Sequence, residues 1–189
     1  MAHNLRPFRD YSEHDVVNLF TFSGSAESSS VVLTKGAVVK VDGAGWQPVA
    51  SNTLGTPIEN LGSVGASYTN TVSERYGTVA KVSLCTNSGQ KPLGITLMDI
   101  RELDENGEKL VFNPRKAAEM NVVVSGQTVP VLTRGVVLYS GVTATARDYA
   151  YVGSNGELIA NASLPAGAFK VGTWLGTSVN GIAPLKLEL

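Results

Sequence analysis

The sequence has few of the residues on which most enzyme and metal sites depend. Its 189 residues include one cysteine, Cys85, and two histidines, His3 and His14. A single thiol excludes an internal disulfide, and so few sulfur and imidazole ligands do not supply a structural zinc site. Cys85 lies in the alternating run VAKVSLC, which is typical of a small buried hydrophobic residue.

Charged residues are also scarce. They make up 16% of the chain, against about 25% in an average soluble domain, and the net charge is −1. This balance excludes the broad basic field of a nucleic-acid-binding protein. The sequence also lacks an apolar run of about 18 residues and the apolar segment of a secretory signal. We expect a soluble protein made in a reducing cytoplasm, with neither nucleic acid nor membrane as a partner.

Motifs for catalysis and nucleotide binding are absent as well. The sequence contains no G-x-S-x-G, G-x-x-x-x-G-K-[ST], H-E-x-x-H or C-x-x-C. The densest acidic stretch, residues 99–108, departs from the spacing of a calcium-binding loop, so we interpret it as a solvated edge. We therefore expect no enzymatic activity, no cofactor and no metal ion.

What the sequence does contain is a β-strand pattern with many turns. It has 20 glycines and 8 prolines, and valine and threonine recur between them. We expect an all-β fold, a β-sandwich or β-barrel-like body, with an extended N-terminal arm and at most one or two short helices. Alternation predicts strands within residues 31–43, 78–85, 93–103, 122–139, 146–159 and 169–189.

Two segments interrupt this strand pattern. Residues 43–77 have few large apolar side chains and are predicted to be a long Gly/Ser/Asn-rich loop. Residues 99–121 look like an inserted hairpin and helix. The inserted hairpin is the turn end of a longer hairpin that we predict over residues 93–113. The short helix that follows has Asn113 as its N-cap and Pro114 in its first turn.

The N-terminal stretch collects residue types that are common in interfaces. The tract GSAESSS has the composition of a linker, and it divides residues 1–30, the predicted arm, from a single β domain over 31–189. Pro7 disfavours helix at Arg6. Aromatic and arginine side chains often dominate binding energy, so the candidate partner-binding residues are Arg6, Phe8, Arg9 and Tyr11.

Three interpretations of this stretch remain open. It is an arm that docks on a partner, a disordered tail, or a strand that packs on the body of its own chain. We take the docking arm as the expectation. On that interpretation the body is complete without residues 2–22 and folds when they are deleted.

The second half of the chain carries a family resemblance. Residues 129–189, VPVLTRG to the final LKLEL, resemble the small capsid cement, or head decoration, proteins of tailed bacteriophages. Matching features are the strand RGVV (134–137), the turn region ARDYAYVGSNGEL (146–158) and the V-G-x-x-L strand that contains Val171. With KGAVVKV and KPLGITLMD, the resemblance extends over residues 31–42 and 79–189.

The resemblance implies a structural virion protein without catalytic residues. It would be synthesised in the host cytoplasm and would bind the outer surface of the assembled capsid, bridging major capsid protein subunits as a homotrimer. Simpler members of the family lack a segment like 43–77, and this departure from the family pattern weakens the implication that the protein is a trimer. The alternatives are a tail or neck subunit of the virion, and a carbohydrate-binding module that presents Trp46 and Trp174.

Overall fold

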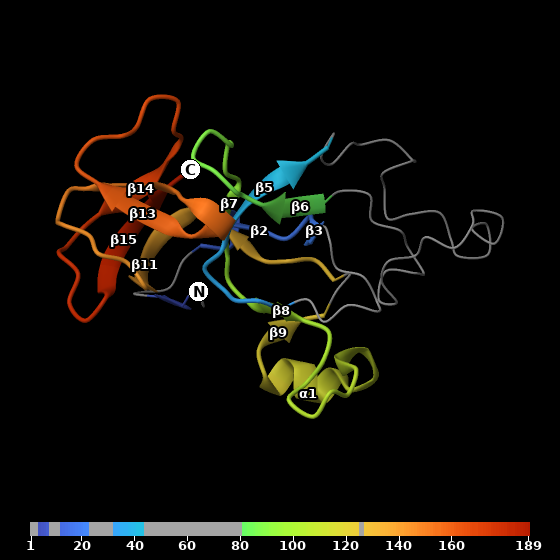
Figure 1. Cartoon of the computed structure of the whole chain (residues 1–189). Coiled ribbons are helices and arrows are strands. Elements are labelled where there is room, and N and C mark those ends of the chain that lie inside the picture. Colours follow the sequence, from blue (N-terminus) through green and yellow to red (C-terminus); the bar gives the residue numbers. More distant parts are fainter. Residues whose placement is uncertain (1–3, 8–11, 23–31, 44–80, 125–126) are drawn as a thin grey trace.

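The structure of the chain is a computed structural model in which almost all regular structure is β-strand (Figure 1). The strands form two six-stranded sheets and one three-stranded sheet, so the predicted all-β fold is confirmed. The structure describes residues 4–7, 12–22, 32–43, 81–124 and 127–189. Helical segments in these residues are α1 (Pro114–Glu119) and the 3-10 turns Glu13–Asp15, Leu110–Phe112 and Ser154–Gly156.

Sheet A is one outer layer, and every neighbouring pair of its strands is antiparallel. Its longest pairing joins β11 and β15, from Arg134 opposite Glu188 to Ser140 opposite Ile182. In spatial order its strands are β1 (Asn4–Pro7), β11 (Arg134–Ser140), β15 (Ile182–Glu188), β14 (Lys170–Trp174), β12 (Tyr149–Val152) and β13 (Leu158–Asn161).

Sheet B lies beside sheet A, and the small sheet C lies beyond it. All pairs in sheet B are antiparallel except β3 with β6. In order, sheet B contains β2 (Val16–Val17), β10 (Val131–Leu132), β7 (Gly94–Thr96), β5 (Val38–Asp42), β6 (Lys81–Leu84) and β3 (Thr21–Phe22). Sheet C contains β4 (Val32–Leu33), β8 (Asp99–Arg101) and β9 (Val122–Val123).

Sheet B is buried on both faces, because neighbouring residues point into different cores. Val38, Ile95 and Leu132 pack in the core shared with sheet A, whereas Val39 and Val131 pack in the core shared with sheet C. All five side chains are fully buried. A sheet covered on both faces needs apolar residues at consecutive positions, which explains the VV and VL pairs in these strands.

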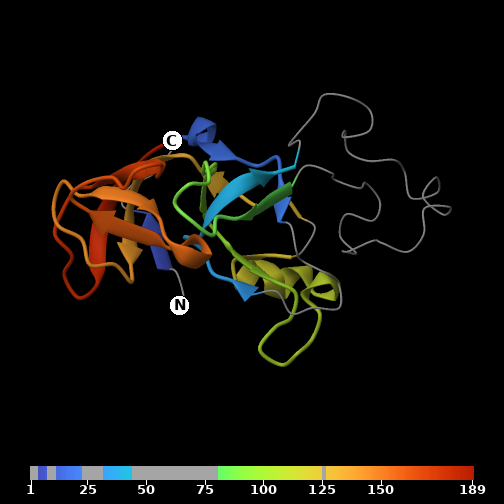
Figure 2. The same ribbon diagram turned by 45° about the horizontal axis from the view of Figure 1, so that its top comes forward.

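Figures 1 and 2 show the same order of layers, with sheet A at one end, the strands of sheet B in the middle, and α1 beside β8 and β9. The turn between β12 and β13 anchors sheet A to sheet B. Gly156 has φ of 71°, and a Cβ there would lie 2.5 Å from Leu84 Cδ1 and 3.1 Å from the Val38 carbonyl oxygen. Glycine alone suits both the backbone conformation and this close approach.

The helix begins as predicted, while the hairpin before it does not form along its predicted length. The Asn113 side chain accepts a hydrogen bond from the Lys116 amide, and Pro114 occupies the first turn of α1. The run expected to form one hairpin over 93–113 instead divides between β7 in sheet B and β8 in sheet C. The far end of the predicted hairpin does form as a short turn, with the bridge between Leu103 and Lys109 and backbone hydrogen bonds from Asp104 to Glu108 and from Leu110 to Glu102. Burial in two cores overrides local alternation here.

The N-terminal residues differ from the expected arm wherever the structure describes them. β1 pairs with β11 in sheet A, β2 with β10 and β3 with β6 in sheet B. Leu5 and Phe20 are buried, with 3% and 7% of their surface exposed. Residues 4–7 and 12–22 therefore belong to the body, because they pair its strands and fill its cores. The loop predicted over 43–77 lies outside the described residues except for Gly43.

We predict that the body depends on its N-terminal strands. Leu5→Ala should lower the free energy of unfolding by about 2–5 kcal/mol, because it deletes a fully packed side chain from the core beneath sheet A. Leu19→Ala is the matched control, since Leu19 is 52% exposed, and it should change stability little. Urea unfolding of both variants checks this, and equal midpoints would show that β1 is dispensable.

Candidate docking surface

The residues singled out at the N-terminus are only partly placed by the structure. Arg6 lies in β1 with its side chain exposed, opposite Leu138 of β11. The other three, Phe8, Arg9 and Tyr11, lie outside the described residues. His14 is exposed in the 3-10 turn Glu13–Asp15, where its amide donates to Ser12 Oγ at 3.3 Å. Arg6 thus stands at one edge of the face of sheet A that turns away from sheet B.

This face, which we call the outer face of sheet A, follows from strict alternation. Val137 and Tyr139 of β11 point into the core, so Val136 and Leu138 point outward. Residues that are paired on adjacent strands point to the same side of the sheet, so the register identifies the outward residues of the other strands. Its apolar and aromatic members are Val136, Leu138, Tyr149, Tyr151, Ile159, Ile182 and Pro184.

The outer face is continuous across the sheet rather than a set of isolated side chains. One row of register partners runs over five strands, from Val136 through Lys186, Thr173 and Tyr149 to Asn161. A parallel row joins Arg6, Leu138 and Pro184. Side chains that are opposite each other on adjacent strands are in contact distance, so these rows form one surface.

The outer face is more apolar than a solvated sheet face. Antiparallel sheets with one wet face normally carry polar residues there. Here Ile182, Tyr149 and Ile159 are each 37–38% exposed, and beside the sheet Leu175 and Val179 are 50% and 69% exposed. A contiguous apolar patch on a soluble protein is typical of a site that contacts another molecule.

The hairpin between β14 and β15 holds Leu175 and Val179 in place. The Leu175 amide donates to the Pro184 carbonyl at 2.8 Å, and Val179 and Ile182 exchange backbone hydrogen bonds of 2.9 and 3.0 Å. Asn180 and Gly181 have positive φ angles of 52° and 73°, the conformation of a tight type I′ turn. These apolar side chains are therefore presented by an ordered hairpin at the end of the face.

Charged groups on the outer face form a fixed network. Lys170 Nζ and Lys186 Nζ each lie 2.7 Å from a different oxygen of the Glu188 carboxylate. Lys170 Nζ also lies 5.7 Å from the centre of the Tyr149 ring. Hydrogen bonds from Lys170 and then Lys186 lower the pKa of the Glu188 carboxyl to about 2.

Positive charge exceeds negative charge on this face. Glu188 is shared by two lysines, and Arg134 stands opposite it in the register. Arg6 adds a further cation at the β1 edge, while Glu157 lies in the turn between β12 and β13. The outer face is therefore an apolar surface with a net positive charge.

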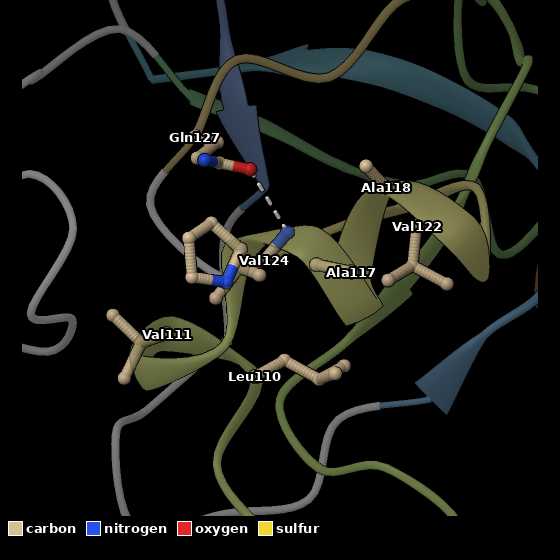
Figure 3. Close-up of a pocket in the computed structure, with 8 residues that line it drawn as sticks. Leu110, Val111, Ala117, Ala118, Val122, Val124 and Gln127 are labelled. Carbon is tan, nitrogen blue, oxygen red and sulfur yellow. Dashed lines mark hydrogen bonds between the residues drawn. The ribbon is translucent and has the colours of Figure 1, made fainter.

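A hollow lies away from this face, in the small unit around α1 (Figure 3). Its volume is about 300 Å³. The Val124 amide donates to Gln127 Oε1 at 3.2 Å across one side of it, as the dashed line in Figure 3 shows. The residues around it are Leu110, Val111, Pro114, Ala117, Ala118, Val122, Val124 and Gln127. This lining has no ionisable side chain, so it supplies no acid, base or ion ligand.

A buried ionic contact stabilises the loop before α1. Asp104 Oδ1 accepts hydrogen bonds of 2.8 Å from the amides of Asn106 and Glu108, and its other oxygen pairs with the Lys116 ammonium. The Lys116 hydrogen bond, with those of the backbone, lowers the pKa of Asp104. Both oxygens of Asp104 are thus engaged by the loop and by α1, which favours a structural role.

The buried aromatic pair Tyr139 and Trp174 belongs to the core. Trp174 is fully buried, and the two ring centres lie 6.0 Å apart at an interplanar angle of 67°. Trp174 therefore cannot present a flat ring to a sugar, while Trp46 lies outside the described residues. The aromatic residues that do reach the surface of sheet A are Tyr149 and Tyr151, which the sequence interpretation did not single out. The sequence signal for this face was the run RGVVLYS, which has apolar residues at consecutive positions and therefore on both faces of the strand.

The outer face of sheet A is the best-defined candidate site in the described residues. No group of three or more His, Cys, Asp and Glu side chains in them is arranged to hold a metal ion. No helix in that part of the chain is long and apolar enough to span a membrane. No protein-family model, curated protein or solved structure matches the chain.

Glu188 should give the protein an acid-sensitive component of stability. Its pKa is depressed in the folded state, so its ion pairs stabilise the fold fully above the ordinary pKa of 4.5 and are lost as pH falls toward about 2. Glu188→Gln should cost about 1 kcal/mol at neutral pH, because the carboxylate is partly exposed, and the cost should disappear as pH falls below about 2. Thermal melts across this range check it, with Glu119→Gln as the exposed control. A constant difference at all pH values would contradict the assignment.

Cys85 should be unreactive in the folded protein. The side chain is fully buried, as the sequence predicted, and burial raises the pKa of its thiol to about 11. Since the thiolate is the reactive form, alkylation by iodoacetamide at pH 8 should be about a hundredfold slower or more than in unfolded protein. Mass spectrometry of timed samples measures this, and equal rates would show that the thiol is accessible.

Proposed function

We propose that the protein is a capsid decoration protein of a tailed bacteriophage. In this role it binds the outer surface of the assembled head and stabilises it by bridging major capsid protein subunits. It acts as a binding protein without catalysis or cofactor. It is synthesised in the host cytoplasm and is located on the virion. Neither a membrane nor nucleic acid is its partner.

The observation that carries this proposal is where the apolar outer face lies in the chain. β11 to β15, which supply most of it, all fall within residues 129–189, the segment that resembles the decoration proteins. The same segment contains the ordered hairpin that presents Leu175 and Val179. A surface built for contact therefore coincides with the region of resemblance. Binding at many equivalent sites on a shell makes such contacts multivalent.

The residues proposed from the N-terminal sequence keep their role as anchors. Arg6 stands beside Leu138 at the edge of the outer face, so the sequence that follows it begins at the border of this surface. We propose that Phe8, Arg9 and Tyr11 extend the contact to the capsid. Self-association as a homotrimer is part of the proposal by analogy with the family.

A tail or neck subunit is the second candidate for a β-rich virion protein. A tail or neck subunit would also need a contact surface, but it would bind the tail or neck of the particle instead of the head. The carbohydrate-binding alternative is weaker, because Trp174, one of its two proposed ring platforms, is in the core.

Purified protein should bind phage heads that lack it. We expect saturable binding at a fixed number of copies per head and a higher temperature of DNA release from decorated particles. Phe8→Ala and Arg9→Ala should each weaken attachment by about 2 kcal/mol, which is about thirtyfold in Kd. The control is His14→Ala, which changes an exposed residue a few positions further along the chain and should bind nearly as the unaltered protein does.

Electron microscopy of the particles distinguishes the two virion candidates. Density on the shell would support decoration, and density confined to the neck or tail would support the second candidate. Failure to bind any part of the particle would contradict both. Light scattering of the free protein tests the trimer, which a stable monomer at high concentration would exclude.

A further inference from the structure

We infer that the outer face of sheet A docks on an acidic and partly apolar surface of the capsid. This inference rests on the proposed function and adds the chemistry of the partner. It concerns a surface formed by rows of side chains across β1, β11, β15, β14, β12 and β13. Three features of that surface determine which occupant it fits.

The first feature is charge. The face has a net positive charge, although the whole chain carries a net charge of −1. Two arginines lie on the neighbouring strands β1 and β11 at one edge of it, Arg6 in β1 and Arg134 at the start of β11, and Lys186 and Lys170 follow on β15 and β14. A guanidinium group pairs well with a carboxylate through two parallel hydrogen bonds. Complementary charge thus calls for a partner with surface aspartate and glutamate.

The second feature is preorganisation. Glu188 holds the ammonium groups of Lys170 and Lys186 by contacts of 2.7 Å, and Lys170 also lies on the Tyr149 ring. Long lysine side chains normally lose conformational freedom when they bind. Because these two are already ordered, they can meet partner carboxylates at a smaller entropic cost.

The third feature is the apolar area between the charges. Ile182 and Tyr149 are each over a third exposed, Tyr149 in the same row of register partners as Lys186 and Ile182 at the other end of β15. Apolar contact supplies affinity, while the surrounding charges set orientation and association rate. Together these groups fit a folded protein surface with acidic and apolar residues intermixed.

Two other occupants fit the face less well. A second copy that presents the same face would bring like charges together, which opposes association. An anionic membrane would meet the Glu188 carboxylate at the centre of the lysine network. A protein surface can instead offer both donors and acceptors to that network.

Matched pairs of variants test the inference on phage heads that lack the protein. Arg134→Glu reverses a charge on the face, and Arg115→Glu reverses one on α1, where the side chain is 89% exposed. Ile182→Ser removes an apolar group from the face, and Phe112→Ser removes one that is 77% exposed near α1. Circular dichroism and thermal melts establish that all four variants are folded.

We expect Arg134→Glu to weaken binding to the heads at least about tenfold at low ionic strength. This loss should shrink in about 1 M salt, where the Debye length falls to about 3 Å. Ile182→Ser should weaken binding about tenfold at both salt concentrations, because apolar contact is not screened. The two control variants should stay within about twofold of the unaltered protein.

Several results would overturn the inference, and they are distinguishable. If the unaltered protein binds and the face variants bind equally well, a different surface docks and only this inference fails. If the unaltered protein does not bind, the proposed function fails and the inference with it. Stronger binding by Arg134→Glu would indicate a basic partner. Phosphatidylserine vesicles that capture the protein, or an oligomer that Arg134→Glu dissociates, would assign the face to a membrane or to a second copy.

Discussion

Val38 and Val39 are neighbours in the chain, yet their side chains enter different hydrophobic cores. The same division occurs at Val131 and Leu132. The centre of sheet B is therefore buried on both faces, and the layers on either side of it depend on its position. Sheet A covers one side and sheet C covers the other. Hydrophobic burial on both faces is the constraint that arranges the layers.

This arrangement leaves sheet A with one face that nothing in the described residues covers. Its inner side chains are committed to the core, so alternation sends the intervening ones outward. Many of those outward residues are apolar, and Lys170 and Lys186 form an ordered ionic network with Glu188. The structural layers and the proposed docking surface are thus two consequences of the same strand periodicity. A decoration protein would need this combination, with a rigid body on one side and a contact face on the other.

The N-terminal residues illustrate how a local pattern can mislead. RPFRDYSEHD has aromatic and charged groups that are typical of an interface, and the flexible composition of residues 24–30 suggested a separate arm. Yet Leu5 fills a site beneath sheet A, and β1 completes the pairing of β11. A strand as short as β1 has almost no signal of its own, because its stability comes from the sheet that it joins. Arg6 is on the surface for the same reason that Leu5 is buried.

The sequence by itself determined the fold class, the short helix after Asn113, the burial of Cys85 and the hairpin around Ser154–Gly156. These features depend on composition, capping and turn residues, which act over a few neighbouring positions. Only the tertiary structure decided that β7 and β8 belong to different sheets, that residues 4–7 join sheet A, and which parity of β11 faces outward. Strand partners and core assignment depend on contacts between residues that are far apart in the chain. A periodic pattern in one segment does not specify those contacts.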